Sequence, residues 1–175
     1  MRDLLRFNVL KRVSRSPWSF YPQVRAGEGK VLLTDSRSLT KLLTTKFKQK
    51  PVVKVLFEGW SRPSIEEMKC LDMVRDQLVW VRETEICIDD EAIIMARSVF
   101  PPSVIRGRYR RLRFMRERSL SKLLFSRSSI QRKSVWFEQG DEKNVSMPVR
   151  HSIFTLNGYP MLLSEWFLSA MNKVL

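Results

Sequence analysis

The sequence predicts an α+β domain, in which an antiparallel β-sheet of consecutive hairpins carries flanking helices. Two observations support this prediction. An alternating apolar pattern runs through residues 79–100 on both sides of Asp89–Asp90, and two further apolar runs flank Asn157–Gly158. Asn-Gly between apolar runs is a strong short-range signal for a hairpin. With 43% hydrophobic residues, we expect residues 1–175 to form a single domain with its own core.

The elements before the first hairpin can be predicted in chain order. Residues 1–30 carry few periodic cues, and "TDSRSLTKLLTTKF" at residues 34–47 then favours a helix. The run "VVKVLFEGW" at residues 52–60 alternates and is rich in β-branched residues, which favours a strand. Ser64 followed by Glu67 has capping-box spacing, so a short helix is expected to begin there.

The elements after the first hairpin complete the sheet. Pro101–Pro102 should end the strand, because proline cannot donate a ladder hydrogen bond. "SLSKLLF" at residues 119–125 predicts a helical turn, and "SSIQRKSVWFE" at residues 128–138 predicts a fourth strand. "GDEKN" at residues 140–144 predicts a loop before the second hairpin.

Each strand of the first hairpin carries one arginine among apolar residues. If Asp89–Asp90 forms a two-residue loop, Arg82 lies directly opposite Arg97. Like charges in that position destabilise a sheet, and buried charges are costly unless paired. The arrangement therefore suits an anion bound between the two guanidinium groups. Two alternatives stay open: one side chain reaches the sheet edge, or a β-bulge changes the register.

The second hairpin places a carboxylate on an apolar face. Glu165 shares a face with Met161 and Leu163, because side chains two residues apart on a strand point the same way. With Asn157–Gly158 as the loop, Arg150 lies opposite Glu165, which allows an ordinary cross-strand ion pair. The alternative is a carboxylate held in an apolar pocket for hydrogen bonding or proton transfer.

The net charge of +14 is concentrated in one segment. Seven arginines lie within residues 106–118, a run that attracts anions such as nucleic acid and acidic lipid surfaces. A solvated loop or helix face would account for it equally. Tyr109 and Phe114 are the only aromatic residues in the run, so a base-stacking platform is not indicated. We expect no nucleic-acid partner.

Other candidate chemistry is sparse. Cys70 and Cys87 form neither a metal-ligand spacing nor a disulfide framework, which fits a reducing compartment, and we expect a cytoplasmic protein. His151 is the only histidine and has no Ser or Cys partner at motif spacing. Without a glycine-rich phosphate loop or a cluster of metal ligands, neither a metal nor an organic cofactor is expected.

Several segments taken together resemble a known family. In order, "DSRSLTKLL", "VVKVLFEGW", "WVRETEICIDDEAIIMARSVFP", "RSLSKLLF" and "GYPMLLSEWFL" are similar to segments of the bacterial chorismate pyruvate-lyases. The resemblance spans about residues 35–170 and leaves residues 1–30 unassigned. It implies a chorismate lyase-like fold and a cofactor-independent lyase. The implied reaction converts chorismate to 4-hydroxybenzoate and pyruvate, the first step of ubiquinone biosynthesis.

The resemblance also implies site residues. Arg82 matches an arginine that holds the ring carboxylate, and Arg97 matches one that stabilises the departing enolpyruvyl group. Glu165 matches a carboxylate near the ring oxygen. The backbone amide of Leu120 matches a contact to the product carboxylate. Leu39 stands where the family has a methionine that supplies a further contact to the product.

The sequence departs from the family at two places and leaves alternatives open. The family's Asp-Gly hairpin loop is Asp89–Asp90 here, and the stretch before residue 119 is unusually rich in arginine. One alternative is a non-catalytic module of the same fold that binds an aromatic acid, as in effector-binding domains of transcription regulators. Another is a basic protein that docks on nucleic acid or a membrane. Peripheral association with an anionic membrane is also compatible with the chorismate lyase interpretation, for which we expect a monomer.

Overall fold

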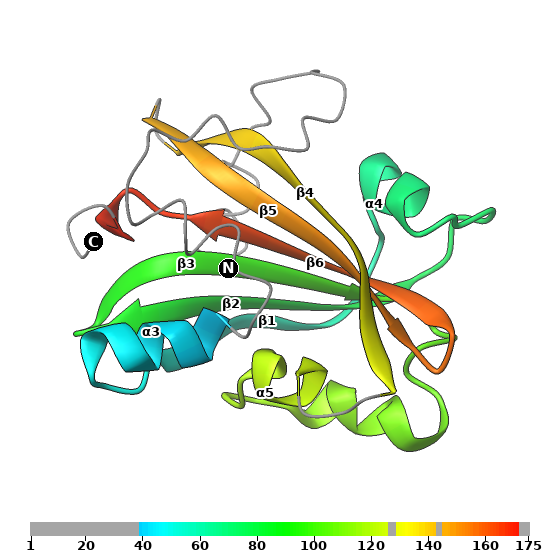
Figure 1. Ribbon diagram of the computed structural model, residues 1–175. Helices are drawn as coiled ribbons and strands as arrows, with labels where there is room; N and C mark the ends of the chain where they lie inside the picture. The colour runs from blue at the N-terminus through cyan, green and yellow to red at the C-terminus, as the bar shows by residue number, and fades with distance from the viewer. Residues whose placement is uncertain (1–38, 126–128, 143–144, 172–175) are drawn as a thin grey trace.

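The computed structural model describes residues 39–125, 129–142 and 145–171. In chain order the elements are α3 (Leu39–Phe47), β1 (Val52–Ser61), α4 (Ile65–Cys70), β2 (Val79–Ile88), β3 (Glu91–Phe100), the 3₁₀ helix η1 (Gly107–Phe114), α5 (Leu120–Leu124), β4 (Ile130–Glu142), β5 (Val145–Leu156) and β6 (Tyr159–Phe167). The strands form one antiparallel sheet in the order β1-β2-β3-β6-β5-β4 (Figure 1). The predicted α+β class is confirmed. Residues 1–30 and the first five residues of the helix predicted at residues 34–47 lie outside the described residues.

Both predicted hairpin loops are confirmed. Asp89 and Asp90 have φ angles of 47° and 62°, and Asn157 and Gly158 have φ angles of 53° and 82°. Positive φ at both central positions is what a type I′ turn requires, and this turn matches the twist of the flanking strands. Glycine adopts such angles without steric cost, whereas aspartate and asparagine tolerate them better than other side chains.

The register of the first hairpin differs from the prediction. An irregularity between Ile86 and Cys87 shifts the pairing of β2 with β3 by one residue for the rest of the hairpin. Arg82 consequently pairs with Ser98, and Arg97 pairs with Glu83. The prediction that Arg82 faces Arg97 is wrong, because a shift of one residue moves a side chain to the other face of the sheet. The alternative of a β-bulge is confirmed.

The predicted loop at residues 140–144 is wrong for residues 140–142, and residues 143–144 lie outside the described residues. β4 continues to Glu142 and pairs with β5 as far as Val145, so Gly140 lies opposite Met147 within the ladder. β4 is an edge strand of the sheet, where a glycine is tolerated better than in a central strand. Backbone pairing with β5 extends the strand through residues whose side chains do not favour one.

The sheet has two distinct faces. α3 and α5 lie side by side on one of them, here named the inner face, where Thr40 Oγ1 and Ser119 Oγ are 3.1 Å apart (Figure 1). α4 packs on the opposite, outer face, and its predicted capping box is confirmed. Ser64 Oγ accepts from the Glu67 N–H at 3.1 Å, and Glu67 Oε2 accepts from the Ser64 N–H at 2.8 Å.

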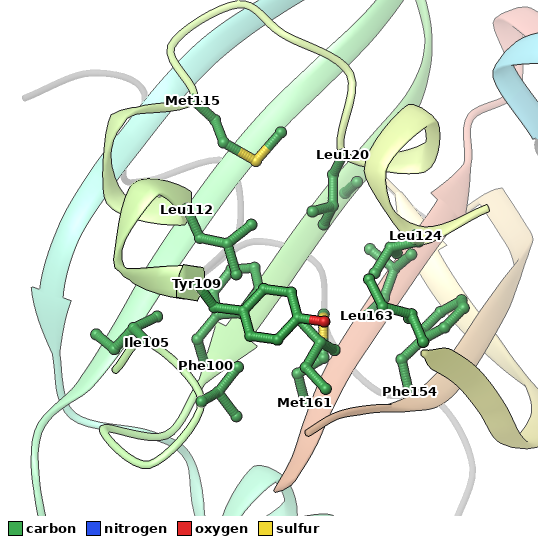
Figure 2. Close-up of a cluster of buried hydrophobic side chains, with 14 residues drawn as sticks. Phe100, Ile105, Tyr109, Leu112, Met115, Leu120, Leu124, Phe154, Met161 and Leu163 are labelled. Atoms are coloured by element: carbon green, nitrogen blue, oxygen red, sulfur yellow. The ribbon is translucent and has the colours of Figure 1, made fainter. Parts of the chain in front are cut away.

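Two apolar clusters cover the inner face. The α5-side cluster consists of Ala96, Phe100, Val104, Ile105, Tyr109, Leu112, Met115, Leu120, Leu124, Ile130, Phe154, Leu156, Met161 and Leu163 (Figure 2). The α3-side cluster consists of Leu39, Leu43, Ile86, Ile88, Ile93, Ile94, Phe167 and Met171. The two clusters fix both helices over the sheet, because each helix contributes its buried leucines to one cluster.

The cysteines and the helices add two smaller observations. Cys87 is buried within the sheet, and Cys70 is partly buried at the end of α4. Both are free thiols. Within the described ranges, none of the helices has the length and apolar character needed to cross a lipid bilayer.

Candidate active site

A band of buried polar side chains crosses the inner face between the two apolar clusters. Arg82 pairs with Ser98, Ser98 pairs with Leu163, and Glu165 lies two residues beyond Leu163, so all four share this face. Across β5 and β6, Arg150 pairs with Glu165. The polar band consists of Arg82, Thr84, Ser98, Arg150, Ser152 and Glu165, each at most 3% exposed. Burial of so many polar groups is costly, which marks the band as a candidate functional site.

Arg82 links the sheet to the loop that leads into α5. Its Nη2 donates to the carbonyl oxygens of Arg116 at 2.6 Å and Arg118 at 3.0 Å. Its Nε lies 3.2 Å from Oε1 of Glu58, its partner on β1. Arg116 has a φ of 49°, an unfavourable conformation for a residue with a side chain. The bond from Arg82 therefore stabilises a strained position of this loop.

The charges of Arg82 and Glu58 are incompletely compensated. Burial lowers the pKa of the Arg82 guanidinium, and the nearby Glu58 carboxylate offsets only part of this effect. Burial likewise raises the pKa of Glu58, with Arg82 opposing it. In both groups the charged form is disfavoured by the loss of water. A further anion beside Arg82 would reduce this penalty.

The structure brings Leu39 and Leu120 close to Arg82. Leu39 is the first residue of α3 and Leu120 is the first residue of α5, and both side chains are buried on the inner face. The contact between Thr40 and Ser119 joins these two helix starts. Since Arg82 bonds the carbonyl immediately before Ser119, three of the predicted site residues meet in one region.

Glu165 lies at the other end of the polar band. Arg150 Nε donates to Glu165 Oε2 at 2.8 Å, so the predicted cross-strand ion pair is confirmed. Arg150 is 1% exposed, and its guanidinium carbon lies 5.6 Å from the ring centre of Phe167. Because β3 separates β2 from β6 and Glu165 lies two residues beyond the position level with Arg82, the backbones of Arg82 and Glu165 are roughly 12 Å apart. A single ring with polar groups at both ends can span such a gap between two inward-pointing side chains.

Two more polar atoms on this face have no hydrogen-bond partner among the described residues. They are the hydroxyl of Ser152, on β5 beside Arg150, and Nε1 of Trp80, on β2 beside Arg82. Buried polar atoms are nearly always paired in native proteins, so such atoms indicate a place where a ligand can bond. Sequence reasoning missed both residues, although the hairpin register places them on the same face as Arg82 and Glu165.

Arg97 lies on the outer face, away from Arg82 and Glu165. Its Nε donates to Glu67 Oε1 at 2.6 Å, its Nη2 donates to Glu67 Oε2 at 3.2 Å, and its Nη1 donates to Glu83 Oε1. Burial lowers the pKa of Arg97, but the two carboxylates more than offset this and leave it raised. Arg97 therefore holds α4 against the sheet with its charge fully balanced.

The outer face holds a second set of polar contacts that motif spacing did not indicate. His151 Nδ1 and Ser164 Oγ are 2.8 Å apart, and His151 Nε2 lies 3.7 Å from Glu138 Oε2. The imidazole stacks on Trp136, with ring centres 5.2 Å apart. The register of the second hairpin pairs His151 with Ser164 and could have predicted this contact.

A cleft of about 400 Å³ opens between α3 and α5. It is lined by Thr40, Lys41, Thr44, Lys50, Ser119, Ser121, Lys122 and Phe125. The lysines give this cleft a cationic rim. Over the ranges that the structure describes, no three His, Cys, Asp or Glu side chains gather in a way that could hold a metal ion.

Comparison with known proteins identifies the family. A family model described as chorismate lyase matches residues 22–174, a longer stretch than the sequence resemblance covered. The chain belongs to the chorismate lyase family. It is 32% identical over 151 residues to a probable chorismate pyruvate-lyase of Marinobacter nauticus, which covers 85% of this chain and 80% of that protein. It is 33% identical over 144 residues to the one of Psychrobacter arcticus, covering 79% and 83%.

Two solved structures of other proteins illustrate the likeness in fold. The C-terminal domain of PhnF matches with a TM-score of 0.56 at 11% identity, covering 71% of this chain and 87% of that domain. A putative transcriptional regulator from Streptomyces coelicolor matches with a TM-score of 0.51 at 14% identity, covering 69% and 88%. At such identities the likeness concerns the fold alone. The family thus shares its architecture with domains of transcription regulators.

Proposed function

We propose that this member of the chorismate lyase family is a chorismate pyruvate-lyase, a carbon–oxygen lyase that converts chorismate to 4-hydroxybenzoate and pyruvate. The observation that carries the proposal is the polar band. It offers an incompletely compensated cation at Arg82 and a carboxylate at Glu165, at opposite ends of one covered face. A ring with a carboxylate at one end and a hydroxyl at the other complements these groups.

The proposed roles follow from position. Arg82 binds the ring carboxylate, assisted by the backbone amides of Leu120 and Leu39. Glu165 lies at the end where the ring hydroxyl and the carbon that loses its proton would sit. It accepts a hydrogen bond from the hydroxyl, or it takes the proton. The bond between the ring and the enolpyruvyl oxygen breaks with its electron pair on that oxygen, and the electron pair of the lost C–H bond completes the aromatic ring. The released enolpyruvate takes up one proton at its methylene carbon and becomes pyruvate, which balances the proton lost from the ring. Because aromatisation drives the reaction, positioning and charge stabilisation are the main demands on the protein.

The enolpyruvyl carboxylate needs its own cation. The resemblance assigns this role to Arg97, but that side chain lies on the outer face between Glu67 and Glu83. On the inner face, Arg150 is the cation beside Glu165. We assign the stabilisation of the departing group to Arg150, and the anchoring of α4 to Arg97.

The experiment that tests the proposal needs no metal or cofactor. Purified protein is mixed with chorismate, and 4-hydroxybenzoate and pyruvate are quantified over time. Equal amounts of both, absent with Arg82→Ala, are the expected result. A protein that forms neither product, yet gains thermal stability from 4-hydroxybenzoate, would be the non-catalytic aromatic-acid binding module instead.

The setting of the reaction is part of the same proposal. We assign the protein to the first step of ubiquinone biosynthesis, acting as a monomer in the cytoplasm without a nucleic-acid partner. Gel filtration with light scattering tests the monomer. Restoration of ubiquinone in a bacterial strain that lacks chorismate lyase tests the pathway.

A further inference from the structure

The arginine-rich segment forms a helix whose geometry separates buried from exposed residues. η1 is a 3₁₀ helix of eight residues, a type with three residues per turn in which side chains at i and i+3 are aligned. Tyr109, Leu112 and the following Met115 keep this spacing, and all three are buried in the α5-side cluster (Figure 2). One row of side chains therefore covers the inner face, and the other two rows point away from it.

The outward rows carry the positive charge. Arg106, Arg108, Arg110, Arg111, Arg116 and Arg118 are exposed, and Glu117 is the one acidic residue between them. Arg108 bonds Asn157 Oδ1 at 2.9 Å, so it is partly engaged. The surface formed by η1, Arg116 and Arg118 is named the η1 surface. Its charge is not balanced locally, so its potential favours an anionic partner.

An exposed aromatic residue lies within this cationic surface. Phe114 is 66% exposed, and the guanidinium carbon of Arg113 lies 5.6 Å from its ring centre. Large apolar side chains with arginine neighbours are typical of segments that lie in the interface of an anionic bilayer. A single exposed ring does not form the row of stacking platforms that single-stranded nucleic acid uses.

We propose that the η1 surface docks on an anionic lipid bilayer, with its arginines at the lipid headgroups and Phe114 inserted between them. The opposite side of η1 packs in the α5-side cluster, whose members Ala96 and Leu163 border the polar band, and the loop after η1 is bonded to Arg82. Docking therefore places the covered site next to the bilayer. This inference does not depend on the chemistry of the site.

The test measures vesicle binding without chorismate. The full chain is sedimented with vesicles of phosphatidylcholine, with and without phosphatidylserine, at low and high salt. Binding to the anionic vesicles alone, weakened by salt, is the expected result. Arg110→Gln combined with Arg111→Gln should weaken binding about thirty-fold, taking about 1 kcal/mol for each cation near the surface. Phe114→Ala should weaken it about ten-fold through lost apolar burial.

A control with the same charge change separates this surface from net charge. Lys69→Gln combined with Arg75→Gln also removes two exposed cations, but in α4 and in the connection that follows it, outside the η1 surface. Near-normal vesicle binding by this control supports a localised surface, and equal loss in both double variants overturns it. Absence of binding to anionic vesicles overturns the proposal, as does tight binding to duplex DNA or single-stranded RNA with none to vesicles.

Discussion

Two arginines, one on each strand of the first hairpin, have opposite environments in this molecule. Arg82 on the inner face has one carboxylate nearby, and burial lowers its pKa. Arg97 on the outer face has two carboxylates, and its pKa is raised in spite of burial. The residue type and the strand context are the same. The difference lies in how completely the fold itself neutralises each charge.

The comparison shows how a structural ion pair differs from a candidate binding group. Arg97 already has the carboxylates that a substrate would otherwise supply, so another anion would gain little there. Arg82 donates to two neutral carbonyls and forms an ion pair with one carboxylate, that of Glu58, without a hydrogen bond between them. Part of the free-energy cost of burying its charge therefore remains, and an incoming carboxylate can reduce it. Substitutions on the two faces should consequently affect different properties.

The largest effect is expected for Arg82→Ala. Loss of the group that binds the ring carboxylate should lower kcat/KM by about a thousand-fold, or about 4 kcal/mol. Steady-state kinetics with chorismate measures this change, and circular dichroism checks the fold, because the substitution also releases the Arg116 carbonyl. Arg82→Lys keeps the charge without the fork geometry, so its loss should be intermediate. Activity close to the parent in Arg82→Ala would remove Arg82 from the site.

Much of the fold that separates these arginines could be predicted from local patterns. The hairpin strands, the Asn157–Gly158 loop and the Ser64 capping box depend on neighbouring residues, and the structure has all three. The one-residue shift between Ile86 and Cys87 could not be predicted. A bulge depends on how the whole hairpin packs, and the bulged residues carry no distinctive signal of their own.

The second-largest effect is expected for Arg97→Ala, and it concerns stability. The substitution leaves the Glu67 and Glu83 carboxylates buried together without their cation, which should cost about 3 kcal/mol of unfolding free energy. Urea denaturation measures this loss. In Arg97→Gln combined with Glu83→Gln, part of the stability should return, because one buried charge is removed with its partner. Retained stability with a large loss of turnover would instead support the family-based role of Arg97 in catalysis.

The site could be predicted only where one hairpin contains both partners. Arg150 and Glu165 belong to one hairpin with a regular loop, so their pairing followed from the sequence. Glu58 reaches Arg82 through the pairing of β1 with β2. The seventeen-residue connection between these strands, residues 62–78, includes α4 and hides this register. Contacts between elements joined by long connections need the folded sheet.

The third effect is expected for Glu165→Gln on the inner face. The carboxamide keeps the size and one acceptor of the carboxylate but cannot take a proton or hold a full charge. We expect turnover to fall about a hundred-fold while 4-hydroxybenzoate still binds. Rapid-quench kinetics and calorimetric binding of the product measure the two quantities separately. A variant that unfolds would mean that the pair with Arg150 serves stability alone.

The smallest expected effect is a pH dependence of stability caused by Glu83, the carboxylate beside Arg97 on the outer face. Burial raises the pKa of Glu83, and Arg97 lowers it only in part. A carboxyl with a raised pKa binds its proton more tightly in the folded than in the unfolded protein. Its contribution to stability is therefore full below its ordinary pKa and is lost as the pH rises through the raised value.

The glutamine in Glu83→Gln cannot titrate, so this substitution should remove the loss of stability that Glu83 causes as the pH rises. Relative to the parent, the unfolding free energy of Glu83→Gln should increase from pH 4 to pH 7, by about 1.4 kcal/mol for each unit by which burial raises the pKa. Urea denaturation across this range provides the measurement, and Glu58→Gln is the matched variant on the inner face, where burial raises the carboxyl pKa in the same direction. A stability difference between Glu83→Gln and the parent that stays constant with pH would contradict this prediction. It would show that the charge of Arg97 already compensates the burial of the Glu83 carboxylate.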